Sequence, residues 1–297
     1  MRRYSFVQVD VFAARPLEGN PLAVFTDARG LSDVEMQALA REMNLSETTY
    51  ILPREGEIER QCGVRVRIFT TEEELPFAGH PTLGTAMVLR ALHSDGGSPS
   101  SVALDLKVGK IPVEFREDPD GQVFGEMRQR DPEFGQAHSP EEIAHLTGFR
   151  GDELDRSVPI QTVSTGVPFT VIPVAGLTSM RRLRLDMAKV SEYASRHDAK
   201  LLYFVTRETE DPVARLHARM IFSGGEDPAT GSAAGCAAAW MARYGIARSD
   251  ESVVIEQGIE AKRPSRIFVR AGVEGERVTN VRVGGYVAEV LRGEVRL

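Results

Sequence analysis

Cysteine is scarce in this sequence, because only Cys62 and Cys236 occur among 297 residues. Two thiols cannot build the disulfide framework of a small secreted domain or a four-thiol zinc site, and such a low number is typical of the reducing cytoplasm. The six histidines form no H-x-x-x-H or H-E-x-x-H pair, so we expect no metal site. We expect Cys62 to begin a strand and both thiols to pack in the protein interior.

Long hydrophobic runs and an excess of basic residues are also lacking. No apolar stretch reaches the ~18–20 residues that span a bilayer, and the first residues lack the apolar core of a signal peptide. Thirty-six Lys and Arg oppose 43 Asp and Glu, which gives a formal net charge of −7. We therefore expect neither a nucleic-acid partner nor a membrane partner.

The usual signatures of nucleotide cofactors and of a serine nucleophile are missing as well. No G-x-G-x-x-G or G-x-S-x-G motif occurs. The segment 225–232 (GEDPATGS) resembles a phosphate-binding loop, but the essential lysine is absent and the spacing is one residue too long. We therefore expect a protein without a bound cofactor.

What the sequence does contain is a series of short β-rich segments interrupted by a few helical patterns. Ser32 and Glu35 form a capping box before a predicted helix over 33–43. Ser139, followed by proline and two acids, begins another helix, and His138 beside it is expected to be solvated. Strands and helices do not alternate regularly, which predicts an α+β protein.

The length and one composition change predict two domains. The segment 128–137 carries proline, glycine and charge, and it is the best candidate for a boundary. We therefore divide the chain into domains at 1–128 and 129–297, although the last strand could return to the first domain. Apolar or alanine-rich patterns predict one long helix in each, over 82–92 and 232–243.

An internal repeat supports this division. At an offset of 152 residues, the segments 67–80 and 219–232 align without gaps, and both are predicted as strand, acidic loop, proline, glycine and helix. Chance is the alternative, since the identities are few. The identical pairs are Arg67/Arg219, Glu74/Glu226, Pro76/Pro228, Gly79/Gly231 and Ala86/Ala238.

Two positions at which the copies of the repeat differ are candidates for a ligand-binding site. Leu75 corresponds to Asp227 and His80 to Ser232, and both pairs flank a glycine at a helix start. Helix N-termini bind carboxylates and phosphates through their backbone N–H groups, and glycine allows a ligand to approach closely. Two such termini would form one cleft. The alternative is that Asp227 caps its helix and Ser232 is an ordinary residue of the first turn.

Glu47 is a candidate general base because it stands beside Ser46 and Thr48 at the start of an otherwise apolar strand. Proton abstraction near neutral pH would require burial to raise the pKa of this carboxyl from about 4.3 towards 6–7. By itself the position is more typical of an exposed acid at a strand start.

These motifs resemble those of the phenazine-biosynthesis PhzF-like isomerases, within the diaminopimelate-epimerase-like superfamily. The resemblance implies two similar domains, each a mostly antiparallel β-barrel around a central helix, with the active site between them. The helices over 82–92 and 232–243 would be the central ones. The resemblance rests on the stretches VDVFAARPLEGNPLAVF (9–25), MQALAREMNLSETTYIL (36–52), RIFTTEEELPFAGHPTLGTA (67–86), ARMIFSGGEDPATGSAAG (218–235) and EQGIEAKRPSRIFV (256–269).

The resemblance also implies an activity and a set of site residues. The best-known member reaction isomerises trans-2,3-dihydro-3-hydroxyanthranilate, a small carboxylate, without a cofactor. Glu47 would be the catalytic acid/base, assisted by His80 and Asp227, and a homodimer is expected. The loop 222–226 looks shorter than in many members, which affects substrate identity. The implied substrate-binding residues are Ser46, Gly79, Thr230, Gly231 and Ser232.

Two other functions remain open from the sequence. Amino-acid epimerases of the superfamily use two thiols, each just before a helix-start glycine, and these places hold Ala78 and Thr230 here. A non-catalytic ligand-binding protein would not require Glu47, so the intact set of site residues disfavours that function.

Overall fold

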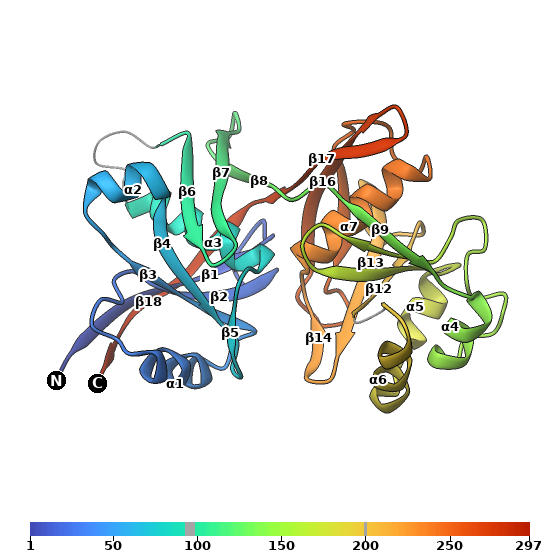
Figure 1. Cartoon of the computed structure of the whole chain (residues 1–297), viewed down its shortest axis with the longest axis horizontal. Helices are drawn as coiled ribbons and strands as arrows, with labels where there is room; N and C mark the ends of the chain where they lie inside the picture. Colours follow the sequence, from blue (N-terminus) through green and yellow to red (C-terminus); the bar gives the residue numbers. More distant parts are fainter. Residues whose placement is uncertain (93–98, 199–200) are drawn as a thin grey trace. The chain divides into compact units, whose positions relative to one another are not determined.

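The computed structural model describes residues 1–92, 99–198 and 201–297. Strands and a smaller number of helices follow one another along the chain, and the predicted α+β class is confirmed (Figure 1). By their contacts, these residues form two compact units. The first comprises Met1–Arg128 with Gly284–Leu297, and the second Gln129–Val283.

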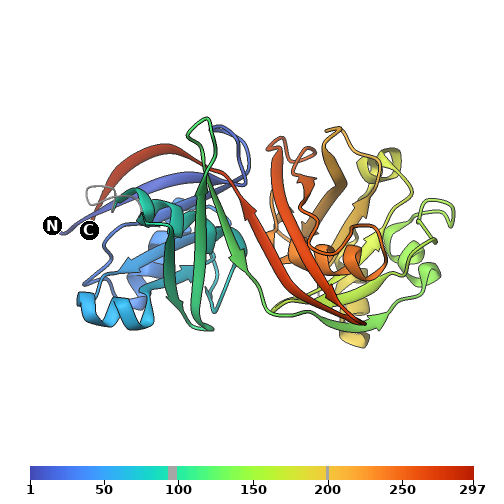
Figure 2. The same ribbon diagram turned by 90° about the horizontal axis from the view of Figure 1, so that it is seen from above.

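The first unit is a mostly antiparallel sheet with a helix packed on it. Strand β18 (Val287–Arg296) returns from the end of the chain and pairs antiparallel with β1 along its whole length, as the red and blue strands show in Figure 2. Its other elements are β1 (Arg3–Val11), β2 (Asn20–Phe25), α1 (Asp33–Met43), β3 (Glu47–Leu52), α2 (Gly56–Cys62), β4 (Val64–Phe69), β5 (Glu74–Leu75), α3 (Gly79–Leu92), β6 (Ser101–Leu106), β7 (Gly109–Glu117) and β8 (Val123–Arg128).

The second unit has the same kind of architecture. Its strand β9 (Glu133–Ala137) pairs antiparallel with β10, as β18 does with β1 in the first unit. Its other elements are α4 (Pro140–Thr147), β10 (Gln161–Ser164), β11 (Pro168–Pro173), α5 (Leu177–Arg182), α6 (Met187–Arg196), β12 (Leu202–Thr206), β13 (Ala214–Phe222), β14 (Gly225–Asp227), α7 (Gly231–Arg243), β15 (Val253–Gln257), β16 (Ser265–Glu274) and β17 (Arg277–Gly285).

The two units repeat one order of strand pairing. In the first, β1–β2 is antiparallel, β2–β3 parallel, β3–β4 antiparallel, β4–β6 parallel and β6–β7 antiparallel. In the second, β10–β11, β11–β12, β12–β13, β13–β15 and β15–β16 follow the same alternation. Both copies of the repeat therefore have the same fold, which is more than a chance match would produce.

Identical residues of the repeat also make identical contacts. Arg67 donates to both carboxylate oxygens of Glu74 at 2.8 and 2.6 Å, and Arg219 donates to those of Glu226 at 2.8 and 2.7 Å. Each bidentate pair ties a strand to the short hairpin that precedes the long helix. Such forked pairs fix geometry as well as contributing energy, so they hold the start of α3 and of α7 in place.

Helices α3 and α7 are each buried along almost their whole length. A helix that is surrounded by protein on all sides cannot carry a polar face, and both are built from small and apolar residues. They begin at Gly79 and Gly231, slightly before the predicted starts at 82 and 232. In the first unit Gly84 lies against Leu22 and Val11, so α3 packs directly on β1 and β2.

Gly84→Ala is expected to lower the free energy of unfolding by about 1–3 kcal/mol, the usual cost of overpacking a core. An added Cβ would lie 2.7 Å from side-chain carbons of both Leu22 and Val11. The control is Gly56→Ala in the exposed helix α2, where the nearest neighbour is an arginine side chain at 3.5 Å. That change should be neutral or stabilising by up to ~1 kcal/mol. Urea unfolding measures both, and a stabilised Gly84→Ala protein would contradict this packing.

Several local predictions are confirmed and two are wrong. Ser32 and Glu35 form the predicted capping box, and Cys236 is buried. Cys62, however, is exposed and ends helix α2 instead of beginning a strand. His138 is buried, not solvated, because its two ring nitrogens contact the hydroxyls of Tyr193 at 2.7 Å and Thr162 at 2.8 Å.

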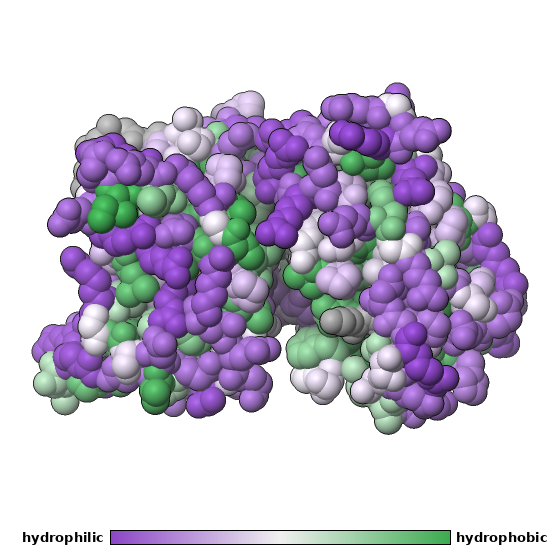
Figure 3. Space-filling model, viewed as in Figure 1, coloured by the Kyte–Doolittle hydropathy of each residue, from purple (hydrophilic) through white to green (hydrophobic). Residues whose placement is uncertain are grey.

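Hydrophilic side chains cover most of the face seen in Figure 3, with hydrophobic side chains scattered between them. Within residues 1–92, 99–198 and 201–297, no helix is both long and apolar enough to cross a membrane.

Candidate active site

Glu47 and His80 meet in the first unit. Helix α1 ends at Asn44, whose left-handed backbone (φ 50°) turns the chain so that Glu47 becomes the first residue of β3. His80 is the second residue of α3. The Glu47 Oε2 and His80 Nε2 atoms lie 3.3 Å apart, and both side chains are largely buried. Two of the predicted site residues, 33 positions apart in sequence, are therefore in contact.

Asn20 contacts the other side of the His80 ring and is not among the site residues predicted from the sequence. The Asn20 Nδ2 and His80 Nδ1 atoms lie 3.2 Å apart, and both residues are buried. With the amide nitrogen of Asn20 toward it, Nδ1 accepts and the single proton of the neutral ring lies on Nε2. Nε2 of His80 thus lies 3.3 Å from Oε2 of Glu47, although the two atoms are not in hydrogen-bond geometry.

The turn before β2 explains how Asn20 reaches this position. Gly19 has φ +63°, and a Cβ there would lie 2.3 Å from the carbonyl oxygen of Val11. Only glycine fits, because both the backbone conformation and the space exclude a side chain. The Gly-Asn-Pro run could have been a signal, but asparagine in a turn cluster is so common that it indicated no more than a turn.

His80 is neutral at physiological pH. Burial lowers its pKa to about 3, because a charged imidazolium would lose its hydration inside the protein. The contact with Glu47 thus brings a neutral ring, and no second charge, to within 3.3 Å of its Oε2.

The beginning of α3 adds backbone donors beside this pair. Gly79 and His80 are both buried at the first turn, where N–H groups have no acceptor within the helix. The Thr82 hydroxyl donates to the Ala78 carbonyl at 2.6 Å and fixes the entry into the helix. Ser46, also predicted as a site residue, is exposed just before β3.

The other predicted residues lie in the second unit. Asp227 ends β14, and its Oδ2 accepts a hydrogen bond of 2.5 Å from the Thr230 hydroxyl. Thr230 is the N-cap residue of α7, yet its side chain makes no capping bond, since it is turned to Asp227. Gly231 and Ser232 form the first turn of α7, and Ser232 is half-buried. The predicted site is thus divided over both units, and its assembly in one cleft stays a prediction.

The two thiols are poorly placed for chemistry. Cys236 lies in the middle of α7, and burial raises the pKa of its thiol to about 11. A thiol in this environment is not a nucleophile or base at neutral pH. Cys62 ends α2, and the residues directly before the helix-start glycines of α3 and α7 are Ala78 and Thr230.

Comparisons with known proteins find full-length similarity. Residues 9–293 match the family model PhzC-PhzF, described as phenazine biosynthesis-like protein. The trans-2,3-dihydro-3-hydroxyanthranilate isomerase of Pseudomonas chlororaphis is 35% identical to this chain. The alignment covers 99% of this chain and 100% of that enzyme. The Bacillus anthracis phenazine biosynthesis protein of the PhzF family has a TM-score of 0.87 at 30% identity, with both chains fully covered.

A more distant solved structure shares the fold alone. The hydroxyproline epimerase from Agrobacterium vitis has a TM-score of 0.65 at 12% identity. The match covers 100% of this chain and 93% of the epimerase chain. Together these neighbours confirm the epimerase-like fold that the resemblance implied.

Proposed function

Because this chain belongs to the PhzC-PhzF family of phenazine biosynthesis-like proteins, we propose that it isomerises a small cyclic carboxylate by proton transfer, with Glu47 as the only acid/base. That it is an isomerase follows from its full-length relatives. The substrate class comes from the trans-2,3-dihydro-3-hydroxyanthranilate isomerases among them. The observation that carries the mechanism is the contact of Glu47 with His80.

The chemistry requires one base and no external oxidant. An alcohol becomes a ketone by isomerisation only when the hydrogen on its hydroxyl-bearing carbon moves to another carbon. Glu47 removes that proton, the electron pair of the broken C–H bond enters the conjugated ring, and the same carboxyl returns the proton to a second ring carbon. This gives an enol, which becomes the ketone when its hydroxyl proton is released and a ring carbon takes up a proton from water. One carbon is oxidised and another reduced, so the reaction balances without a redox cofactor.

The remaining residues bind the substrate and guide the proton. His80 lies against Glu47, with its Nε2 3.3 Å from Oε2, and so limits where the carboxylate can lie. The N–H groups at the starts of α3 and α7, beside Gly79 and Gly231, suit the substrate carboxylate and the charge that develops on the ring. Asp227 and Ser232 orient the polar substituents, with Thr230 holding Asp227.

An epimerase mechanism has less support. Inversion at one carbon needs bases on both faces, and the thiol positions are Ala78 and Thr230. The epimerase neighbour is too dissimilar in sequence to argue for more than the fold.

An isotope experiment tests the proposal. Trans-2,3-dihydro-3-hydroxyanthranilate deuterated at the hydroxyl-bearing carbon is incubated with the protein, and the product is followed by NMR. We expect a ketone that retains part of the label at a second ring carbon, because one carboxyl carries the proton between them. Absence of any ketone would overturn the activity on this substrate, and complete loss of label would overturn the single-base step. Exchange with inversion at the α-carbon of amino acids would instead favour the epimerase.

A further inference from the structure

Gln257, the last residue of β15, lies directly behind the loop that carries Asp227. Its amide is fully buried and uses all of its hydrogen-bonding positions. Oε1 accepts from the Thr230 backbone N–H at 3.2 Å and from the Tyr203 hydroxyl at 3.0 Å. Nε2 donates to the Asp227 carbonyl at 2.7 Å and to the Thr230 hydroxyl oxygen at 2.9 Å.

The orientation of this amide is unambiguous. A backbone N–H can only donate and a backbone carbonyl can only accept, so the Thr230 N–H and the Asp227 carbonyl fix which end of the Gln257 amide is oxygen. Nε2 therefore donates to the Thr230 hydroxyl. That hydroxyl has one proton of its own, and the acceptor for it is Asp227 Oδ2 at 2.5 Å.

The same loop is also held through its backbone. The Ser265 hydroxyl lies 2.8 Å from the Pro228 carbonyl and 3.1 Å from the Gln257 carbonyl. Gly258 has φ +80°, and a Cβ there would lie 2.5 Å from the Pro228 carbonyl oxygen, so the two segments touch. The loop backbone therefore has its own support, and the Asp227 carboxylate accepts from the hydroxyl of Thr230.

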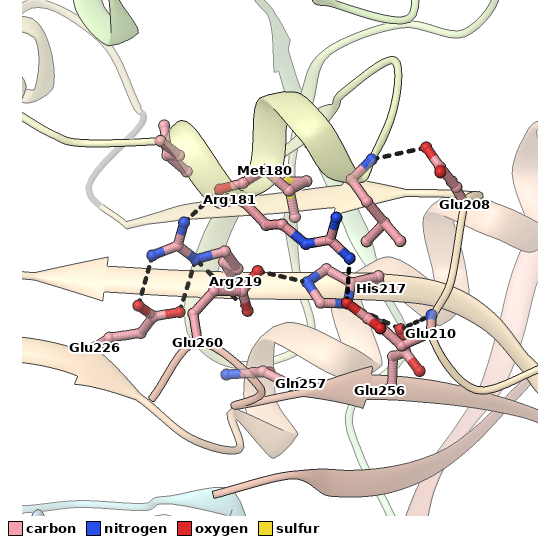
Figure 4. A network of polar contacts seen from close by, with 12 residues as sticks. Met180, Arg181, Glu208, Glu210, His217, Arg219, Glu226, Glu256, Gln257 and Glu260 are labelled. Carbon is pink, nitrogen blue, oxygen red and sulfur yellow. Dashed lines mark hydrogen bonds and ion pairs between the residues drawn. The ribbon is translucent and has the colours of Figure 1, made fainter. Parts of the chain in front are cut away.

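Glu256, which precedes Gln257 in β15, has different partners. Glu256 holds His217 in a buried network, as Figure 4 shows, while Gln257 contacts Thr230. Successive side chains of a strand point to opposite faces. Gln257 and the charged network thus act on separate sides of β15, and a change at Gln257 leaves the His217 contacts in place.

We propose that Gln257 is a positioning residue of the reaction: it polarises and orients the Thr230 hydroxyl, which in turn holds the Asp227 carboxylate in its working direction. This rests on the proposed function, in which Asp227 contacts the substrate. Gln257 has no exposed surface, so it acts through Thr230 and not on the substrate.

Three variants separate positioning from stability. Gln257→Met keeps length and removes all four hydrogen bonds, and Thr230→Val removes only the hydroxyl. Tyr203→Phe is the matched control, because it removes a buried hydrogen bond of the same amide and leaves both donor contacts of Nε2 intact. Each protein is checked for folding by its thermal unfolding.

We expect kcat on trans-2,3-dihydro-3-hydroxyanthranilate to fall roughly 10- to 100-fold in Gln257→Met and in Thr230→Val, the cost of a misplaced group, with KM changing less than about threefold. The double variant should be no slower than the slower single one, because both changes break the same relay. Tyr203→Phe should keep kcat within about twofold. A loss in Gln257→Met no larger than in the control, or losses that multiply in the double variant, would overturn the proposal.

Crystal structures of the same variants provide a readout that does not depend on turnover. The Asp227 side chain should occupy more than one rotamer in Gln257→Met and Thr230→Val, and a single rotamer in Tyr203→Phe. An unchanged Asp227 in all three would overturn the positioning role. If the unmodified protein shows no turnover, the proposed activity on this substrate fails, and the rotamers alone decide the role of Gln257.

Discussion

Replacing Glu47 by glutamine should lower kcat for the isomerisation roughly 10³-fold, within the 10²–10⁴ range that positioned acid–base groups contribute. Glutamine has the size of glutamate, so it fills the same largely buried position beside His80. The glutamine amide cannot take up a proton from the substrate, so the variant lacks the proposed base. Binding of anthranilate, an unreactive aromatic carboxylate related to the expected substrate, should therefore change less than about twofold by calorimetry.

The control for this variant is Glu42→Gln, an exposed carboxylate of α1 five residues earlier. It changes the net charge by the same amount and should leave both turnover and anthranilate binding unaltered. A Glu47→Gln protein with turnover within about tenfold of the unmodified protein would contradict the single-base mechanism. Loss of anthranilate binding together with turnover would indicate that Glu47 is a binding group.

The second large effect concerns stability and pH. The imidazole of His217 has no exposed surface and contacts Glu256 Oε1 at 2.8 Å and Glu260 Oε1 at 3.2 Å (Figure 4). Burial by itself lowers the pKa of this ring. The hydrogen bonds and negative charges of both glutamates outweigh it and raise the pKa to about 9. His217 is therefore protonated in the folded protein at neutral pH, as one member of a buried ion cluster.

The free energy of unfolding should consequently fall as the pH rises. In the unfolded chain the pKa of histidine is about 6.5, so the raised folded value stabilises the protein fully below that pH. The stabilisation is lost as the pH rises through about 9. A difference of this size corresponds to roughly 3 kcal/mol. Urea unfolding of the full chain at several pH values from 6 to 9.5, with a probe in the second unit, measures it.

His217→Gln isolates this contribution. It should unfold at lower urea at neutral pH, since the buried Glu256 and the half-buried Glu260 lose the cation between them, and a broken buried pair costs about 3–5 kcal/mol. Its stability should also depend less on pH over this range. His145→Gln, at an exposed position of α4, is the control and should retain the full slope. The same slope in both variants would show that His217 is not the group responsible.

The two wrong predictions have different physical causes. Helix α2 buries none of its residues, so it lacks the apolar periodicity by which helices are recognised, and Cys62 was assigned to the following strand. His138 stands before a surface helix, but its partners Thr162 and Tyr193 lie 24 and 55 residues away. No local pattern contains such partners, and burial of a polar side chain depends on them.

The sequence by itself determined the capped starts of α1 and α4, the 152-residue repeat and the family, because caps, turn glycines and motif residues act over a few neighbouring positions. It identified Glu47 and His80 one at a time. Only the tertiary structure placed them in contact, supplied Asn20 from 60 residues away in sequence, and thereby decided which nitrogen of His80 carries the proton. It also placed Gln257 behind Thr230. A hydrogen-bond direction is set by the partner in space, and the order of residues along the chain does not contain that partner.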